Sequence, residues 1–190
     1  MDTVPYRRIE ELTHEHISIV PYDPSWPERY AELEQRFSRS LPADLITRIV
    51  HIGSTAVPGS SAKPIIDVQV EVKSLARVRR EVVPIMRDLA FEYIWRPTMG
   101  EHAPFYAWFI GRNAKGERNA HVHVVEPDEV SHGRILFRDF LRVHPEERER
   151  YEALKHALHV AHPDDRAAYT QGKTDFIVSI VARAREHATT

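Results

Sequence analysis

One segment of the chain constrains its fold more than any other, because it alternates without interruption between apolar and polar side chains. The segment from Ile65 to Val72 is rich in β-branched residues, which indicates a β-strand. Successive side chains of a strand point to opposite faces, so this strand has one apolar face and one polar face. The polar face carries Asp67, Gln69 and Glu71. The sequence therefore predicts a strand that packs on a core on one side and presents carboxylates on the other.

The segments around this strand change in kind along the chain. Further strands are predicted at 17–20, 48–52, 91–95, 104–111 and 119–125, and a helix over 74–89. Helical spacing of apolar residues dominates from Val130 onward, with a last helix at about 165–187. This order predicts an α+β fold with a mixed β-sheet, packed helices and a C-terminal helical region. The polar residues 1–16 are expected to form a flexible N-terminal arm, and residues 17–190 a single domain.

Composition limits the possible partners. The chain has 190 residues, of which 42% are hydrophobic and 28% charged, as in a globular protein. Its formal net charge of −2 gives no general attraction for nucleic acid, so nucleic acid is not expected as the main substrate. There is no cysteine, which excludes disulfides and thiolate metal sites. With no apolar run long enough to span a bilayer, we expect a soluble, cytoplasmic protein.

The loop that precedes the alternating strand contains the residues best suited to bind a phosphate. Gly53, Ser54 and Thr55 follow the strand predicted at 48–52, and such small residues let backbone N–H groups approach a phosphate. Lys63 adds a positive charge, and Asp67 offers a carboxylate that could hold a divalent cation against the same phosphate. Gly-Ser-Thr is also common in ordinary turns, so a purely structural role stays open.

The same stretch carries a resemblance to a known family. The chain reads HIGSTAVPGSSAKPIIDV from residue 51, HVHV from residue 121 and FRDFLR from residue 137. With these motifs the sequence resembles the GrpB family over nearly its whole length. The resemblance implies a nucleotidyltransferase fold and a nucleotide or other phosphate-containing small molecule as the ligand. Some members of the family are fused to dephospho-CoA kinase, which implies a possible association with a coenzyme A biosynthesis enzyme.

One position departs from the pattern of the wider superfamily, in which two acids stand one residue apart on the strand. Asp67 fits this pattern, but the next position on the same face is Gln69, which brings no negative charge. Glu71 lies on the same face, two residues beyond Gln69, and alternate residues of a strand are already roughly 6.5 Å apart. A two-magnesium transfer mechanism is therefore in doubt, and a tentative site for magnesium or manganese would depend on Asp67 with Glu71.

Two histidines on another predicted strand complete the candidate site. His121 and His123 alternate and so point to the same face. Next to Asp67 they could bind a transition metal, with zinc a weaker choice than manganese, or act with Asp67 as catalytic acid and base. They could equally be solvated residues of a chain with 12 histidines. Arg138 and Lys173 join the phosphate-binding candidates because they lie in family-like motifs.

Three functions remain open at the level of the sequence. The first is a metal-dependent nucleotidyltransferase-like enzyme, which the Gly-Ser loop, Lys63 and Asp67 favour. The second is a module that binds a nucleotide or a coenzyme A precursor without chemistry, which Gln69 favours. The third is an assembly role beside a coenzyme A enzyme, which only the fusions in the family suggest.

Overall fold

The computed structural model describes residues 6–96 and 106–188, and a five-stranded sheet forms the centre of this part of the chain. The strands are β1 (Ile46–Ile52), β2 (Ile66–Val72), β3 (Glu92–Arg96), β4 (Tyr106–Arg112) and β5 (Arg118–Val125). Their order in the sheet is β1-β2-β5-β4-β3. Only β2 and β5 pair in parallel, so the sheet is mixed as the sequence predicts.

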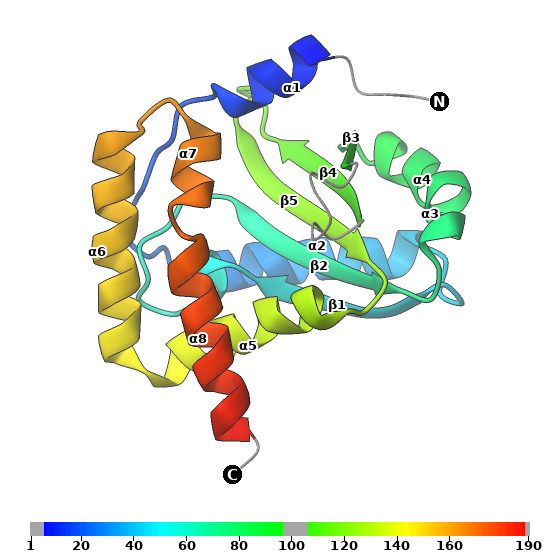
Figure 1. Ribbon diagram of the computed structural model, residues 1–190. Coiled ribbons are helices and arrows are strands. Elements are labelled where there is room, and N and C mark those ends of the chain that lie inside the picture. Colours follow the sequence, from blue (N-terminus) through cyan, green and yellow to red (C-terminus); the bar gives the residue numbers. More distant parts are fainter. Residues whose placement is uncertain (1–5, 97–105, 189–190) are drawn as a thin grey trace.

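Helices cover both faces of the sheet (Figure 1). In the first half of the chain they are α1 (Tyr6–Thr13), α2 (Trp26–Ser40), α3 (Leu75–Glu81) and α4 (Val83–Asp88), with a 3-10 turn η1 (Ser54–Ala56) after β1. In the second half they are α5 (Glu129–Val143), α6 (Pro145–Ala161), α7 (Arg166–Gln171) and α8 (Thr174–Ala188). The α+β class with a C-terminal helical region is thus confirmed.

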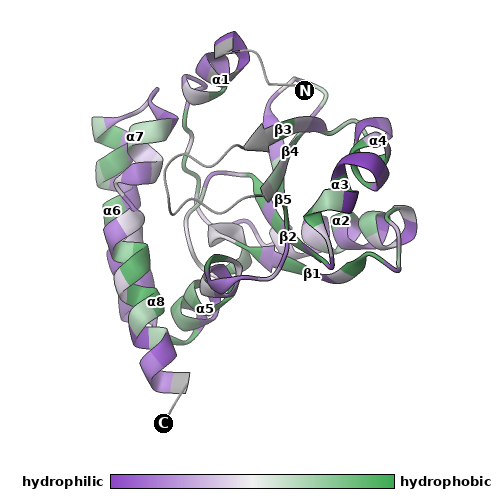
Figure 2. Cartoon of the chain, turned by 45° about the vertical axis from the view of Figure 1, so that its right-hand side comes forward, coloured by the Kyte–Doolittle hydropathy of each residue, from purple (hydrophilic) through white to green (hydrophobic). Residues whose placement is uncertain are grey.

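The main core lies between one face of the sheet and helices α2 to α4. The alternating side chains of β2 supply Val68, Val70 and Val72, which are fully buried against residues such as Phe37 of α2 and Val78 of α3. Figure 2 shows both green, hydrophobic segments and purple, hydrophilic segments along the strands. The opposite face of β2 carries Asp67, Gln69 and Glu71, as the alternation predicts.

A second, smaller core belongs to the C-terminal helices. Buried side chains of α5, α6 and α8, among them Phe137, Tyr151 and Ile180, pack together with Val57 of the loop after β1. Figure 1 shows α6, α7 and α8 side by side, next to the ends of β2 and β5. Residues 145–188, which contain these three helices, are called the helical cap below. The cap lies near Asp67, whose charge acts on Lys173 and Tyr151 of the cap.

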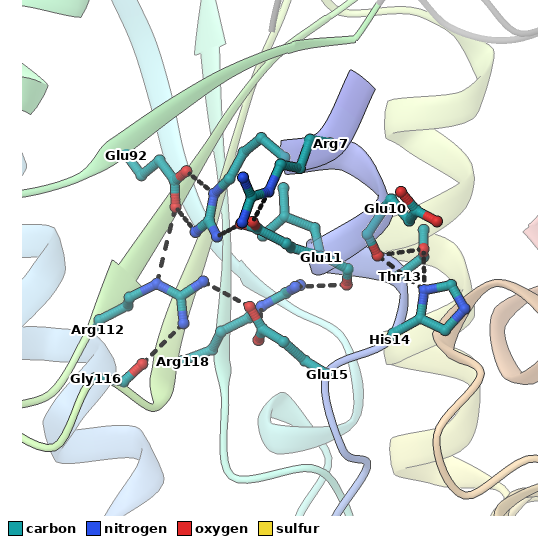
Figure 3. A network of polar contacts seen from close by, with 12 residues as sticks. Arg7, Glu10, Glu11, Thr13, His14, Glu15, Glu92, Arg112, Gly116 and Arg118 are labelled. Atoms are coloured by element: carbon teal, nitrogen blue, oxygen red, sulfur yellow. Dashed lines mark hydrogen bonds and ion pairs between the residues drawn. The ribbon is translucent and has the colours of Figure 1, made fainter. Parts of the chain in front are cut away.

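The structure differs from the expected flexible N-terminal arm. Residues 6–13 form α1, whose Leu12 is buried with Ile94 and Ile110 in a small apolar cluster on the polar face of the sheet. Ion pairs add to this contact: Arg8 binds Glu92 with distances of 2.6 and 2.7 Å, and Arg118 binds Glu15 at 2.6 Å (Figure 3). The polar composition of the arm conceals this docking, because its partners are themselves charged.

Two predicted helices are each divided in two. Pro84 lies at the start of α4, where its missing N–H interrupts the helix predicted over 74–89. The last helix is broken between α7 and α8 at Gly172 and Lys173. Residues 17–20, predicted as a strand, make only one isolated bridge, between Val20 and Ala62. Within the described residues, the structure contains no helix of the length and apolar character needed to cross a membrane.

Candidate functional site

The polar face of the sheet brings together Asp67 and the two histidines of β5. Asp67 pairs with His121 in the register of β2 and β5, so both side chains leave neighbouring strands at the same level. The Asp67 Oδ1 atom lies 3.2 Å from His121 Nδ1 and 3.7 Å from His123 Nε2. The Asp67 side chain is 29% exposed, which leaves it open to a ligand. The sequence predicted this group of one carboxylate and two imidazoles.

The contacts of Asp67 decide its charge. Burial alone would raise the pKa of the carboxyl, but hydrogen bonds from His121 and His123 outweigh it and hold the pKa below its usual range. Burial lowers the pKa of both histidines, that of His123 to about 4, so they are neutral at pH 7. The His121 ring therefore donates through Nδ1 to an ionised Asp67 and keeps a lone pair on Nε2. That Nε2 atom is buried and has no hydrogen-bond partner among the described residues.

The Gly-Ser loop touches the Asp67 carboxylate directly. Gly53 has a φ of +73° and a ψ of −174°, a conformation that is essentially confined to glycine. A Cβ atom on Gly53 would lie 2.6 Å from Asp67 Oδ2, so only glycine lets the loop pass this close. Thr55 points elsewhere: its Oγ1 lies 3.0 Å from His51 Nε2 and donates to the carbonyl of Ile65. Gly53 thus belongs to the site, whereas Thr55 holds the loop in place.

Lysines surround the carboxylate. The Nζ atoms of Lys63 and Lys173 lie 5.1 and 4.4 Å from the ring centroid of Tyr169, a buried residue of the cap. The pKa of Lys63 is lowered to about 7, chiefly by burial and then by the neighbouring Lys173, whereas Asp67 opposes the shift. Burial also lowers the pKa of Lys173 to about 8, again opposed by Asp67. Two lysines of reduced basicity therefore lie near one carboxylate.

A third lysine stands at the Gly-Ser loop and was not among the site residues that the sequence suggested. Lys155 of α6 is 2% exposed, and its Nζ donates to Ser60 Oγ at 3.1 Å, to Ser54 Oγ at 3.5 Å and to the Ser61 carbonyl. Burial lowers its pKa to about 8. In the sequence it looks like an ordinary charge on an exposed helix. Its only signal there is its place in a stretch of family-like character, residues 151–155.

Two of the expected site residues lie apart from Asp67. Glu71 accepts a hydrogen bond from Gln69 Nε2 at 3.0 Å, and the same amide donates to the Ser131 carbonyl. Arg138, a phosphate-binding candidate, donates to the His51 carbonyl at 2.7 Å and forms an ion pair with Asp139. Because its carboxylate accepts the Gln69 amide, Glu71 does not join the group around Asp67. The hydrogen bond to the His51 carbonyl places Arg138 at the outer edge of the sheet, beside β1.

The donor atoms form a poor cage for a resident metal ion. A zinc or manganese site needs three or more ligands about 2.0–2.2 Å from the ion. Within residues 6–96 and 106–188, no group of three or more His, Asp or Glu side chains has that arrangement. The positive charges of Lys63 and Lys173 near Asp67 also disfavour the binding of a metal cation there. The unpartnered Nε2 of His121 remains a possible ligand atom, but Asp67 is the only carboxylate beside it among the described residues.

The fold and the site together define a class: an α+β protein with a mixed sheet, a helical cap, and lysines near one carboxylate on the polar face of the sheet. The model of the GrpB protein family matches residues 16–183. The chain therefore belongs to the GrpB family, as the motifs predict. A UPF0157 protein of Pseudomonas aeruginosa is 38% identical over 180 residues, which are 94% of this chain and 72% of that protein. The protein YqkA of Bacillus subtilis is 32% identical, and the match covers 89% of this chain but only 47% of YqkA.

Solved structures agree with this assignment. The crystal structure of the conserved protein GrpB from Enterococcus faecalis has a TM-score of 0.76 and 30% identity, and it covers 91% of this chain and all of that one. A cytoplasmic RNA terminal U-transferase is also similar, at 13% identity and a TM-score of 0.45, a level that says nothing about activity. A dephospho-CoA kinase of Mycolicibacterium paratuberculosis is 33% identical over 79 residues, 40% of this chain and 19% of the kinase.

Proposed function

We propose that this protein binds a nucleotide or another phosphate-containing small molecule at Asp67 and acts on it as a nucleotidyltransferase-like enzyme. One observation carries the proposal: Lys63 and Lys173 lie on Tyr169 beside Asp67, and both lose part of their basicity through burial. Lys63 and Lys173 are only partly exposed, and positive charge that is partly removed from water is costly unless an anion lies beside it. A phosphate group does so, and the loop at Gly53 and Ser54 lies against the same carboxylate.

The side chains then have distinct roles. Lys63 and Lys173 neutralise the phosphates, and Lys155 fixes the loop through Ser54 and Ser60. In a nucleotidyl transfer, the oxygen of an acceptor hydroxyl attacks the α-phosphorus, pyrophosphate leaves, and a base takes the hydroxyl proton. His121 suits that base, because Asp67 holds its Nδ1–H and leaves Nε2 able to accept a proton. His123 supports the charge of Asp67 from the same strand.

A divalent metal belongs to the proposal only as an ion that accompanies the phosphates. Magnesium is commonly bound by one or two carboxylates together with substrate phosphates and water, and Asp67 supplies one such carboxylate. Zinc would depend on His121 and His123 and fits this donor set less well. A resident metal would be retained by the purified protein, whereas an ion that accompanies the substrate would bind only with the nucleotide. Metal analysis before and after dialysis distinguishes these cases.

The main alternative is a module that binds the same ligand without chemistry. It is favoured by Gln69, which stands where the superfamily has a second acid and uses its amide to bind Glu71 and Ser131. The partial similarity to a dephospho-CoA kinase makes coenzyme A precursors natural candidates for this ligand. It also motivates an association with a coenzyme A enzyme, which co-purification with a dephospho-CoA kinase of the same organism would test.

A thermal-shift panel of nucleoside triphosphates, dephospho-CoA and phosphopantetheine, with and without magnesium or manganese, tests the proposal. A ligand at about 100 times its dissociation constant adds roughly 2.7 kcal/mol to the free energy of unfolding, which is a shift of several degrees. Lys63→Met should abolish the shift, and Asp164→Asn, an exposed control, should not. Absence of any shift throughout the panel contradicts both the enzyme and the binding module.

Product analysis separates the two functions. With a ligand found in the panel, the enzyme should release pyrophosphate when acceptors are added, and Asp67→Asn should stop that release while the fold stays intact. Binding without product in the wild type would favour the module. Unchanged turnover in Asp67→Asn would remove Asp67 and His121 from the proposed chemistry.

A further inference from the structure

A second cavity lies on the far side of the Gly-Ser loop, away from Asp67. It has a volume of about 320 Å³ and is enclosed by α2, β1, the loop after β1 and α5. His51 pairs with Val68 and Ile52 with Asp67, so His51 lies on the face of the sheet opposite to Asp67. Figure 1 shows β1 with α5 on one side and α2 on the other. Arg48, by contrast, pairs with Glu71 on the polar face, so the cavity lies around the outer edge of β1. Its lining does not include Asp67, although both sites share the loop after β1.

The lining of this cavity has an excess of positive charge. Arg138 and Arg142 share the carboxylate of Asp139, at 2.8 and 3.3 Å, and Arg48 has no ion pair among the described residues. Burial lowers the pKa of Arg142, and the neighbouring Arg138 lowers it further, although Asp139 opposes both effects. The nearby carboxylates of Asp139, of Glu34, which accepts the hydroxyl of Tyr30, and of Glu71, which stands opposite Arg48 in the register of β1 and β2, lie outside the lining. The residues that line the cavity thus include three arginines and no carboxylate.

Two of the three arginines are held in place by hydrogen bonds, whereas Arg48 is exposed. Arg138 is 9% exposed and donates to the His51 carbonyl, and Arg142 Nε donates to the Ala56 carbonyl at 2.9 Å. The remaining wall is aromatic and apolar, with Tyr22, Pro27 and the ring of Tyr30. Guanidinium forks of fixed orientation beside an apolar wall suit a ligand that has a phosphate at one end and a ring at the other.

We propose that this cavity is a second anion site, which binds a small phosphate monoester. Its phosphate lies between Arg48 and Arg142, and its organic group lies on Tyr22 and Pro27. The volume is at the lower end of the range for small-molecule pockets, which admits a phosphate with a ring but no dinucleotide. Because Ala56 lines this cavity and Gly53 touches Asp67, an occupant would contact the other side of the loop that serves the first site.

Calorimetric titration with phenyl phosphate tests the proposal, with phenol as the uncharged probe. The titration uses the full chain carrying Lys63→Met and Lys173→Met, so that binding at the Asp67 site does not contribute. Phenyl phosphate should bind with a stoichiometry of one, and phenol at least tenfold more weakly. Adding Arg48→Gln or Arg142→Gln should each weaken phenyl phosphate about tenfold, the effect of losing one charge-assisted contact worth about 1.4 kcal/mol.

Each other result overturns the proposal. Equal affinity for phenol and phenyl phosphate, or no binding at millimolar concentration, would exclude a phosphate site. Unchanged affinity in Arg48→Gln, whose exposed side chain has no ion pair to lose among the described residues, would place the ligand elsewhere. Binding that is seen only in the wild type and disappears with Lys63→Met and Lys173→Met would assign all phosphate binding to Asp67, and would leave the proposed function intact. Far-UV circular dichroism confirms that each variant is folded.

Discussion

The contact between Gly53 and Asp67 is the tightest constraint at the level of single residues. The backbone of Gly53 lies so close to the carboxylate that a methyl group would overlap Oδ2. Gly116 has nearly the same positive φ, +79°, but no atom lies within 4 Å of the place where its Cβ would be. A comparison of alanine substitutions at the two glycines therefore distinguishes the cost of backbone strain from the cost of displacing the carboxylate.

We expect Gly53→Ala to destabilise the protein by at least about 1–2 kcal/mol more than Gly116→Ala, which carries only the strain of a positive φ. Gly53→Ala should also weaken ligand binding at Asp67, because the carboxylate must move. Urea unfolding of both variants measures the difference. Equal losses in the two variants would show that the loop yields without disturbing Asp67.

Part of the site could be predicted residue by residue. Alternation along a strand placed Asp67 on the polar face of β2, and His121 and His123 on one face of β5, before any neighbour was known. The side chains that complete the pocket could not be found in this way. Lys155 and Tyr169 lie on helices, and a single charged or aromatic residue on a helix forms no repeating pattern that would indicate its role. Only the position of the cap in the folded protein brings them to the site.

Among the elements, α1 shows how charge can conceal a packed helix. Figure 2 colours α1 mostly purple, the colour of hydrophilic residues. Its one well-buried apolar side chain among those described is Leu12, which joins Ile94 and Ile110, and Arg118 Nη2 donates to the Leu12 carbonyl at 2.7 Å. A hydrophobic pattern therefore could not indicate docking, because ion pairs and one leucine hold the helix.

Leu12→Ala should lower the free energy of unfolding by about 2 kcal/mol, the lower end for a buried leucine, since the apolar cluster around it is small. Arg7→Ala is the matched control in the same helix. Its side chain is 89% exposed and pairs only with Glu11, so a change within about 0.5 kcal/mol is expected. Urea unfolding followed by circular dichroism measures both. A similar small effect of the two variants would mean that α1 is not docked in solution.

For the molecule as a whole, buried neutral histidines link stability to pH. The pKa of His51 is lowered to about 4. Burial is the main cause, Asp67 opposes it, and the positive charges of Arg142 and Arg138 add to it. The ring stacks on Tyr30 and binds Thr55. In the unfolded chain the imidazole has a pKa of about 6.5, so the unfolded state binds a proton first as the pH falls. The free energy of unfolding therefore decreases between pH 6.5 and about 4, and this contribution is fully present only above pH 6.5.

His51→Gln should reduce that pH dependence. Between pH 7 and pH 5 the variant should lose roughly 2 kcal/mol less than the wild type, since one pKa unit corresponds to about 1.4 kcal/mol. Urea unfolding at the two pH values gives the difference. His132→Gln, at an exposed position of α5, serves as the control and should follow the wild type. Parallel curves for His51→Gln and the wild type would mean that His51 titrates alike in both states.

The parallel pairing of β2 with β5 has a consequence for how the molecule is made. Asp67 and His121 are 54 residues apart, and the chain between them contains α3, α4, β3 and β4, so the pairing of the two strands closes a long loop. Closing so long a loop is entropically costly and slow, because the stabilising contacts between the two strands form only once they have paired. A nascent chain that still lacks β5 therefore has the Gly-Ser loop but no histidine beside Asp67. A ligand that needs both Asp67 and His121 therefore binds only the complete fold, and a phosphate ligand would stabilise only molecules in which β2 and β5 have paired.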